Sequence, residues 1–517
     1  MKKISQRTTI NFPFGGWGAV LGALLFLASC DKGFDDLNVN KTAALAVNPV
    51  FILNNATVNS SYSNGTLFYE MGIVQQMITP NEGVLAGANF NQDIRGNTEQ
   101  NWQKYYRTVV RHTQDVIDQT KALPNRSNLT NMARILQANA FMILTDSYGD
   151  IPYTDASKGY TNQVFSPKYD AQQSVYAGII KELTEASAAL DASKTIETAD
   201  ILYNGNIALW KKYGNSLLLR AGMRLSKVDA AQAQQIVARA AQGGVMEVNA
   251  DNAAIKHDAN YVNGIGNLLN STEAANVYLA APFAEFLQKT NDPRLRSIAV
   301  RYVGAKSGPE QVAARATTDP ALQIGMPFGF NNSTIATQVA ANKLASFYDF
   351  SQVDRTRMTK NTTPTFLVTA AQTQLLLAEA AQRGWVTGTT AETYFSRGVR
   401  LNMEQMAIFE AGAAVPAAAI TTYLAANTLV AATALEQINT QYWVASFLNG
   451  AEAFANFRRS GFPKLTPNPF SGKNIKGDFI RRLTYPNSEI SINNANVKEA
   501  IARQGADDLD TRVWWDK

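Results

Sequence analysis

Apolar side chains recur at helical spacing through most of the chain, and the segments with this pattern come in pairs. Trp102, Tyr105 and Val109 belong to the first such segment, residues 99–121, and residues 128–147 predict its antiparallel partner. The four predicted helical pairs cover about residues 99–148, 171–226, 366–410 and 431–459. This pattern predicts a mainly α protein.

Turn-forming residues separate the helices of these pairs. Gly149 and Pro152 follow the second helix of the first pair, where they are ordinary helix-stop residues. Gly384 and Gly388 lie between the helices of the third pair, and Asn449-Gly450 lies between those of the fourth. Repeated helix–turn–helix units indicate a tetratricopeptide-like helical-hairpin array, whose repeat is about 34 residues.

Residues 245–365 have a different composition. Asn, Gly, Thr and Pro are frequent there, and only residues 274–289 predict a helix. Loops longer than about 12–15 residues without secondary structure are usually functional. We therefore expect a loop-rich, variable, ligand-binding lobe between the second and third helical pairs.

The N-terminus has the features of a secretory signal. Three basic residues precede an apolar stretch that ends in small residues at Ser29, and no acidic residue appears before Asp31. This order predicts a signal peptide over residues 1–29. The alternative is an uncleaved anchor helix, which is disfavoured because the apolar stretch is too short to cross about 30 Å of hydrocarbon.

Cys30 is the only cysteine of the chain, and it follows Leu27-Ala28-Ser29 directly. The order resembles a bacterial lipobox, in which the thiol is acylated and becomes the new N-terminus. We therefore predict that Cys30 holds the lipid and that residues 30–48 are a lipid-anchored tether. Acylation would leave the mature chain without a thiol for a disulfide, a metal or a nucleophile.

The charge balance of the mature chain is close to neutral. The 517 residues include 47 basic and 42 acidic side chains, and the predicted signal contains three of the basic ones and none of the acidic ones. A nucleic-acid-binding protein needs Lys and Arg clustered on one face, and the sequence shows no such cluster. We expect no nucleic-acid partner.

Candidate catalytic and metal chemistry is sparse. His112 and His257 are the only histidines, and they are far apart in the sequence. A Ser-His-Asp triad or a histidine-rich metal site is therefore disfavoured. The chain has no phosphate-binding glycine loop, and we expect neither a cofactor nor a metal site.

Several motifs together resemble the SusD/RagB-like outer-membrane nutrient-binding lipoproteins of Bacteroidetes. The most specific is the run 438–443 followed by 452–463, which reads Glu-Ala-Phe-Ala-Asn-Phe-Arg-Arg-Ser-Gly-Phe-Pro in its second part. The other matching stretches are residues 34–40 after the lipobox, 148–153, 210–220 and 375–380. The similarity spans almost the whole mature chain in the same order.

The resemblance implies a single SusD-like domain over residues 49–517, with four tetratricopeptide-like pairs and a variable lobe. It implies an outer-membrane, cell-surface location and a SusC-like TonB-dependent transporter as partner. Members bind oligosaccharides, or peptides in some branches, and are not known as catalysts. Asp31, Asp35 and Asp36 would be the surface-export signal.

Loop aromatics are the candidate ligand-binding residues. A sugar stacks its C–H faces on aromatic rings, while its hydroxyl groups need polar partners such as Asn. The candidates pair an aromatic with an asparagine nearby: Tyr62 with Asn64, Phe90 with Asn91, Tyr261 with Asn263, and Phe328 with Asn331. The alternative for each ring is that it packs its own loop against the body. The helical aromatics Trp102, Tyr105, Tyr106, Trp210 and Trp443 are expected in the core.

Charged residues on the helices are open to structural interpretations. Asp146 and Asp150 lie within one turn and could be the carboxyl pair of a glycosidase, but a helix C-cap and turn is favoured. Arg220 and Arg224 share one helix face and are expected to form ion pairs between packed helices. We expect Arg458-Arg459 to be a solvated helix end.

These observations rank the possible functions. Capture of an oligosaccharide for a transporter is first, and a peptide-binding member of the same family is second. An extracellular hydrolase that depends on carboxylates is third, and a scaffold built on the helical repeats is fourth.

Overall fold

A computed structural model describes residues 47–81 and 86–517. The predicted signal peptide, Cys30 and all of the predicted tether except its last two residues lie outside the described residues. Residues Pro49–Lys517 form one compact unit. Helices make up most of this unit, so the prediction of a mainly α fold is confirmed.

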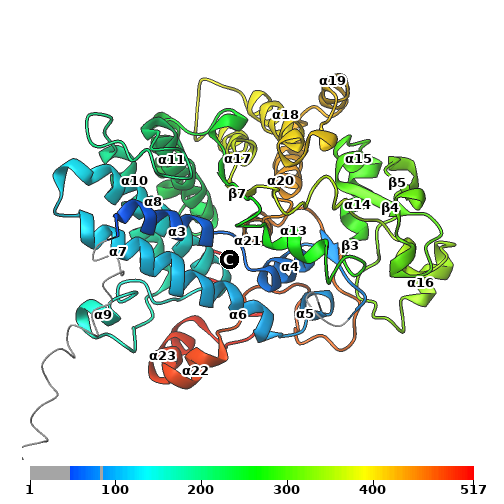
Figure 1. Ribbon diagram of the computed structural model, residues 1–517, viewed down its shortest axis with the longest axis horizontal. Coiled ribbons are helices and arrows are strands. Elements are labelled where there is room, and N and C mark those ends of the chain that lie inside the picture. The colour runs from blue at the N-terminus through cyan, green and yellow to red at the C-terminus, as the bar shows by residue number, and fades with distance from the viewer. Residues whose placement is uncertain (1–46, 82–85) are drawn as a thin grey trace, which may run out of the picture. The chain divides into compact units, whose positions relative to one another are not determined.

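Paired helices pack side by side in the order in which they follow one another along the chain (Figure 1). The helices of the first half are α3 (Pro49–Asn59), α4 (Asn64–Ile73), α6 (Arg95–Lys104), α7 (Arg111–Thr120), α8 (Ser127–Tyr148), α10 (Gln172–Ala189), α11 (Ile207–Arg224) and α12 (Ala230–Gln242). Helices α7 and α8, α8 and α10, α10 and α11, and α11 and α12 are in contact. The first two predicted pairs are therefore present as antiparallel neighbours.

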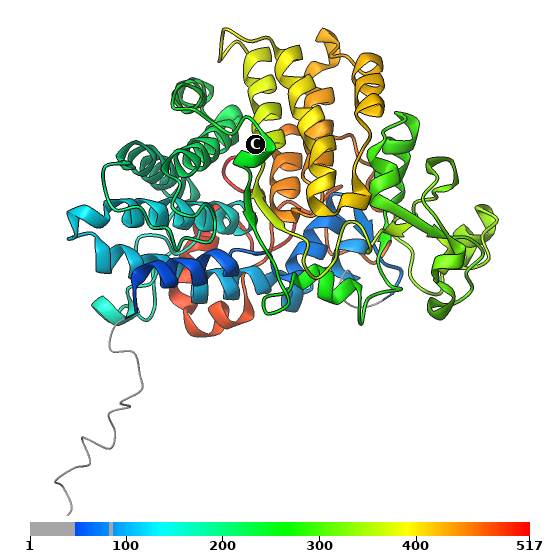
Figure 2. The same ribbon diagram turned by 45° about the horizontal axis from the view of Figure 1, so that its top comes forward.

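The third and fourth pairs lie together in the second half of the chain. They consist of α17 (Ala370–Gln382), α18 (Ala391–Phe409), α20 (Ala434–Ala445) and α21 (Gly450–Ser460). Helix α17 contacts α18, α20 and α11, while α21 contacts α4 and α8. Figure 2 shows α17, α18 and α20 as adjacent yellow and orange helices. These contacts close the array, because α21 joins the last pair to the first.

Local sequence explains where several helices begin and end. Thr369 and Gln372 form a capping box at the start of α17, in which the side chain of each residue accepts a hydrogen bond from the backbone N–H of the other residue. Asn206 caps α11 by accepting a hydrogen bond from the backbone N–H of Leu209. Helix α8 ends at Gly149, whose φ of 82° is a conformation that glycine adopts without strain.

The first predicted helix, residues 99–121, differs in detail from the observed one. Helix α6 begins at Arg95, and the segment Tyr105–Val110 between α6 and α7 is a π-helix. The spacing of apolar residues cannot distinguish a π-helix from an α-helix over a segment of only six residues.

The lobe at residues 245–365 is more regular than the sequence predicts. It contains the short helices α13 (Gly264–Leu269), α14 (Ala281–Lys289), α15 (Arg294–Ile298) and α16 (Ala336–Ala341). Its strands are β2 (Ala253–Ile255), β3 (Tyr278–Leu279), β4 (Ala299–Tyr302), β5 (Ala316–Thr317) and β6 (Gln352–Val353). Elements this short are held by tertiary contacts and leave little periodicity in the sequence.

The strands form three small antiparallel sheets, of which two connect the lobe to the helices and the third lies within the lobe. Strand β3 pairs with β1 (Met77–Ile78), β2 pairs with β7 (Thr365–Val368), and β4 lies between β5 and β6. The helix predicted over residues 274–289 is therefore wrong in its first half. Helix α14 begins only at Ala281 because the preceding residues hydrogen-bond in β3, and Pro282 suits the first helical turn.

The remaining helices lie outside the four pairs. They are α5 (Ala86–Asn89), α9 (Gly159–Asn162), α19 (Ala417–Ala426), α22 (Asn487–Ile492) and α23 (Asn494–Gln504). The last two cover the end of the first helical pair through hydrogen bonds to the segment before α10, such as Asn493 Nδ2 to the carbonyl of Pro167 at 2.8 Å.

One large apolar core runs through all four pairs, and a second small core lies under the lobe. The second core contains Ile78, Tyr278, Ala280, Met326, Ile335 and Phe350. Trp102, Tyr105, Trp210 and Trp443 are buried in the large core, as predicted, and Tyr106 is half-buried against it. The lobe thus has its own support beside the helical array.

Candidate functional site

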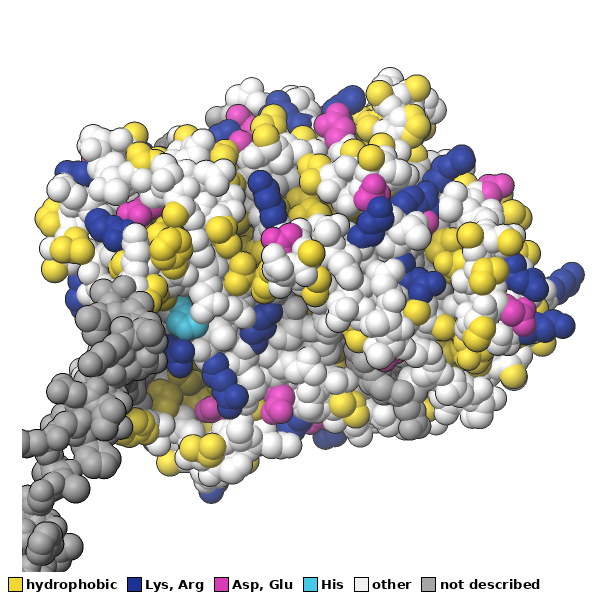
Figure 3. All heavy atoms as spheres, viewed as in Figure 1, with side chains coloured by type: hydrophobic (Ala, Val, Ile, Leu, Met, Phe, Trp, Pro, Cys, Tyr) yellow, Lys and Arg dark blue, Asp and Glu magenta, His cyan; other side chains and the backbone are white. Residues whose placement is uncertain are grey.

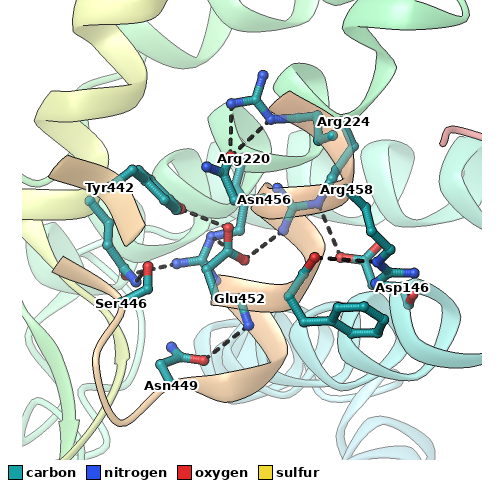
Figure 4. Close-up of polar contacts among 12 residues, drawn as sticks. Asp146, Arg220, Arg224, Tyr442, Ser446, Asn449, Glu452, Asn456 and Arg458 are labelled. Carbon is teal, nitrogen blue, oxygen red and sulfur yellow. Dashed lines mark hydrogen bonds and ion pairs between the residues drawn. The ribbon is translucent and has the colours of Figure 1, made fainter. Parts of the chain in front are cut away.

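A buried ionic cluster joins α8, α11 and α21 at the centre of the unit (Figure 4). Arg224 Nη2 lies 2.7 Å from Glu452 Oε2, and its Nε lies 3.2 Å from Asp146 Oδ2. Arg220 Nε lies 3.3 Å from the same oxygen of Glu452. The predicted ion pairing of Arg220 and Arg224 between packed helices is therefore confirmed.

The two carboxyl groups of this cluster have pKa values shifted in opposite directions. Burial opposes the charge of Glu452, but Arg220 and Arg224 hold its pKa below the usual value. Burial raises the pKa of Asp146, and Arg224 only partly offsets this. Asp146 also accepts hydrogen bonds from Tyr176 and from the indole of Trp515, so its oxygens are fully used within the fold.

The two carboxylates of the hydrolase alternative do not face a substrate-sized space. Asp150 Oδ1 accepts a hydrogen bond from the backbone N–H of Gln172 at 2.8 Å, and Arg503 Nε donates to Oδ2 at 2.6 Å. This is the cap-and-turn role that we favoured from the sequence. The cavity that Asp146 lines measures about 10 Å³, which is too small for a sugar.

The prediction of a solvated end at Arg458-Arg459 is wrong. Both side chains are 1% exposed. Arg459 forms a two-pronged ion pair with Glu379 of α17, and Arg458 Nη2 donates to the carbonyl of Asp146 at 2.7 Å. Two adjacent arginines at a helix end suggest solvent, but here the neighbouring helices supply buried acceptors.

Two of the predicted ligand-binding residues line a small cavity of about 40 Å³, and a third, Tyr261, lies on the same loop as one of them. Tyr62 and Asn263 line it, and the Tyr62 hydroxyl donates to the carbonyl of Phe366 at 3.4 Å. Asn263 caps α13 by accepting from the N–H of Gly266. Tyr261 stacks on His257 at a ring separation of 5.3 Å. The cavity has room for water but not for a sugar ring.

Nearby, Asn64 supports the same loops. Its Nδ2 donates to the carbonyl of Gly264 at 3.0 Å, which ties the start of α4 to the start of α13. Around this first cavity, the asparagines predicted beside aromatics thus hold backbone in place.

The other four predicted residues lie on loops that meet near α5. Phe90 is buried and its ring lies 4.6 Å from that of Phe470. Asn91 adopts a left-handed turn with φ of 51°, and its carbonyl accepts from the N–H of Asn474. The side chain of Asn331 accepts from the N–H groups of the two residues that follow Asn332, so it shapes a turn before α16. Phe328 is half-buried against the second core.

Two asparagines that the sequence analysis missed hold these loops together. Asn89 Nδ2 donates to the carbonyls of Thr79 and, at 3.4 Å, Phe330. Asn468 Nδ2 donates in turn to the carbonyl of Asn89. The backbone is therefore fixed where the rings meet.

We define the aromatic loop cluster as Phe90, Phe328, Phe330 and Phe470. Three of its rings, those of Phe328, Phe330 and Phe470, are partly exposed. Phe470 directly follows the proline-rich stretch 463–469, which was the only sequence signal that could have indicated it. A pair of amide groups lies on the segment that Asn89 holds: Asn81 Nδ2 donates to Asn276 Oδ1 at 2.7 Å, and Asn81 follows Thr79, whose carbonyl accepts from Asn89.

Surface charge, potential metal ligands and helix hydropathy also bear on the function. On the face in Figure 3, basic and acidic side chains are scattered among uncharged ones, without a continuous basic stripe. Within residues 47–81 and 86–517, no group of three or more potential metal ligands occurs. No single helix in the same ranges is long and apolar enough to span a membrane. The segments Ala411–Ala426 and Ala431–Ala445 reach the required length and apolar composition only when taken together, and they are bent by 96° relative to one another.

Comparison with known proteins identifies relatives over nearly the whole chain. The family model SusD-like, described as "Starch-binding associating with outer membrane", matches residues 40–486. A search of curated protein sequences gave no significant match.

Solved structures extend this likeness to the fold. A structure described as a chitin-binding protein is 31% identical, with a TM-score of 0.81, and the match covers 91% of this chain and 100% of that one. A protein described as "Bacteroidetes AC2a SusD-like" is 27% identical with a TM-score of 0.79, over 91% and 100% of the two chains. A chitin-binding SusD homologue from Flavobacterium johnsoniae is 25% identical with a TM-score of 0.71, over 91% and 97%.

Proposed function

This chain belongs to the SusD-like family, and from that membership we propose that it is a surface glycan-binding protein that captures an oligosaccharide. The observation that carries the proposal is the match to a chitin-binding protein at 31% identity over 91% of the chain. Chitin oligosaccharides are therefore the first ligands to test, and starch oligosaccharides are the second because of the family description.

The aromatic loop cluster is the proposed contact surface. Its three partly exposed rings, of Phe328, Phe330 and Phe470, offer apolar faces for the C–H groups of a sugar. The amides of Asn81 and Asn276 on adjacent loops offer both donors and acceptors for hydroxyl groups. The hydrogen bonds of Asn89 support the proposal, because they fix the loops before a ligand arrives and so reduce the entropy cost of binding.

Phe328 and Asn331 of the sequence prediction remain candidates at this surface. Phe90 would support the site from beneath, since its ring packs on Phe470. Tyr62, Tyr261 and Asn263 would contribute only through the loops that they hold, because the cavity beside them is too small for a sugar.

Binding without catalysis is favoured by how the carboxylates are used. Asp146 and Glu452 pair with Arg224, and Asp150 pairs with Arg503. A glycosidase needs two carboxyl groups on opposite sides of a sugar, about 5–9.5 Å apart across an open space. We propose no catalytic residue.

Delivery to a transporter completes the proposal. A lipid on Cys30 would hold the protein on the outer membrane at the cell surface, and a SusC-like TonB-dependent barrel would receive the captured oligosaccharide. Family membership supports this arrangement. Co-purification of the barrel with the protein from mild detergent tests it.

A calorimetric titration of the full-length protein tests glycan capture. We expect saturable binding of chitin or starch oligosaccharides, without release of shorter products over hours. Phe328→Ala and Phe470→Ala should each weaken binding about fivefold to tenfold, because one stacking contact is lost. Phe165→Ala is the matched control, since this ring is 77% exposed on a different loop.

Two results would contradict the proposal. Peptides that bind while oligosaccharides do not would favour the peptide alternative. Equal glycan affinity in all three phenylalanine variants would exclude the aromatic loop cluster as the contact surface.

A further inference from the structure

A separate cavity, of about 230 Å³, is lined by the end of α6, the π-helix, the loops on either side of α9, and α22. Its apolar lining comes from Trp102, Tyr106, Pro152, Ala156, Pro167 and Ile492. Its polar lining comes from Gln103, Arg107, Ser157, Ser488 and Glu489. It shares no residue with the aromatic loop cluster.

The apolar side of this cavity is rigid. Trp102 is 3% exposed and packs against Tyr106 at a ring separation of 4.9 Å. The Tyr106 hydroxyl donates to the carbonyl of Pro152 at 2.6 Å, which fixes the ring relative to the loop. The indole N–H of Trp102 donates to no other group in the described part of the chain. A ligand in the cavity could therefore accept a hydrogen bond from this indole.

The mouth of the cavity exposes an apolar side chain. Ile492 of α22 is 77% exposed, although it lies beside the tryptophan-lined interior. A bound ligand with an apolar face would remove this surface from water, which is favourable at about 25 cal/mol per Å².

The backbone around the cavity is irregular in two places. Tyr106 and Arg107 lie in the π-helix Tyr105–Val110, and π-helical turns are rare and frequently occur at functional sites. Ser157 on the opposite wall has a positive φ of 61°, a conformation that costs a non-glycine residue free energy. The two irregularities change the directions in which Tyr106, Arg107 and Ser157 leave the backbone, compared with a regular α-helix or turn.

The polar side chains of the lining are held in place by neighbouring residues, and each can still form hydrogen bonds to a ligand. Gln103 Nε2 donates to Ser488 Oγ at 2.9 Å, and Tyr169 donates to Glu489 Oε2 at 2.8 Å. Ser488 thus orients the Gln103 amide, and Tyr169 orients the Glu489 carboxylate. The amide oxygen of Gln103 and Oε1 of Glu489 accept no hydrogen bond from the described residues. Arg107 is exposed and forms no ion pair within residues 47–81 and 86–517.

These features define the chemistry of a ligand. One guanidinium and one carboxylate make the lining neutral overall, so a strongly charged ligand gains nothing from it. Rigid apolar walls beside acceptors, donors and hydroxyl groups suit a compact polyol with C–H faces. The volume limits the ligand to about one six-membered sugar ring with its substituents.

We propose that this cavity is a second carbohydrate site, which binds a single neutral pyranose unit independently of the aromatic loop cluster. Its ligand class follows from the proposed function, whereas its residues and its location do not. The sugar would accept from the Trp102 indole and from Arg107, and would donate hydroxyl hydrogens to Glu489 and Gln103. A terminal unit of a longer glycan fits the same site.

The test is a ligand-detected NMR titration of the full-length protein with glucose and with N-acetylglucosamine. We expect saturable binding of at least one of them. Arg107→Ala and Glu489→Gln should weaken it about tenfold, since each removes a hydrogen bond that involves a charged group. Arg400→Ala and Glu404→Gln are matched controls, because both side chains are exposed on α18.

A Phe328→Ala/Phe470→Ala double variant separates this proposal from the proposed function. Monosaccharide binding that survives in this variant, while oligosaccharide binding is lost, supports two independent sites. Failure of oligosaccharide binding in the wild type, with monosaccharide binding intact, would count against the loop site alone.

Three results would overturn the second site. They are the absence of monosaccharide binding to the wild type, an unchanged affinity in both cavity variants, and binding of free phenylalanine in place of either sugar.

Discussion

Arg459 on α21 binds both carboxylate oxygens of Glu379 on α17, with N–O distances of 2.8 and 2.7 Å and with both side chains shielded from water. The two residues lie 80 positions apart in the sequence. Asn439 of α20 donates to the same carboxylate, and its own oxygen accepts from Arg459. The third and fourth helical pairs are therefore joined by one fully bonded ionic group.

Breaking this pair from one side should destabilise the protein strongly. Arg459→Met leaves the buried Glu379 carboxylate with only the partly exposed Arg383 as an ionic partner, and breaking a buried ion pair from one side costs about 3–5 kcal/mol. We expect a fall of that size in the free energy of unfolding, measured by denaturant titration at pH 7. Arg400→Met on the exposed face of α18 should change it by less than about 0.5 kcal/mol. Equal losses in the two variants would contradict the role of the pair.

The same pair predicts how the protein responds to acid. Burial alone would raise the pKa of Glu379, but Arg459 lowers it from 4.5 to about 2. The stabilisation is therefore fully present above pH 4.5 and is lost as the pH falls toward 2, which amounts to roughly 3 kcal/mol. Unfolding measured between pH 5 and 2.5 should show this loss in the wild type. Glu379→Gln should be less stable at pH 7 and should lose less between these pH values.

Glu70 on α4 predicts the opposite dependence. Burial raises its pKa to about 8, since only Ser147 donates to its carboxylate among the described residues. Folding therefore favours the protonated form, and stability should decrease as the pH rises from 4.5 to 8, by up to about 1.4 kcal/mol per pH unit.

The amide variant Glu70→Gln isolates this effect. It should be more stable than the wild type at pH 8, and its stability should change less between pH 5 and 8. Thermal unfolding at a series of pH values measures both quantities. Glu404→Gln, an exposed substitution, should follow the wild type, and a wild-type curve flat from pH 5 to 8 would count against the buried acid.

The lipid prediction has a separate test. Cys30→Ala should release the protein from the membrane fraction, because the acylated thiol is the proposed anchor. Affinity for oligosaccharide should stay nearly unchanged, since the proposed contact surface lies on loops of the folded unit. Fractionation of cells followed by titration of the released protein measures both. Retention of the variant in the membrane fraction would show that another segment anchors the chain.

The fold could be predicted to different degrees along the chain. Helix α8 and the outer ends of the pair α10 and α11 occur within one or two residues of their expected bounds, because a long amphipathic pattern is a local property. The lobe could not be predicted in the same way. Strand β3 forms only because β1, about 200 positions earlier, lies beside it.

The candidate site was predictable in its chemistry more than in its geometry. The preference for loop aromatics with asparagines led to Phe90 and Phe328, whose loops are joined by the hydrogen bond from Asn89 to the carbonyl of Phe330. It did not lead to Phe470, because this ring lies next to Phe90 only when the C-terminal segment folds back against the loop that contains Phe90. Nor could it show that the asparagines mostly hold backbone.

The sequence by itself determined the helical pairs, the near-neutral charge, the scarcity of histidine and cysteine chemistry, and the family resemblance, because each is written in local order or composition. Tertiary structure alone decided which charges are buried and which rings are open. Arg459 shows the physical reason: its neighbours along the chain suggest a solvated helix end, whereas its state depends on Glu379, which only folding brings within 3 Å.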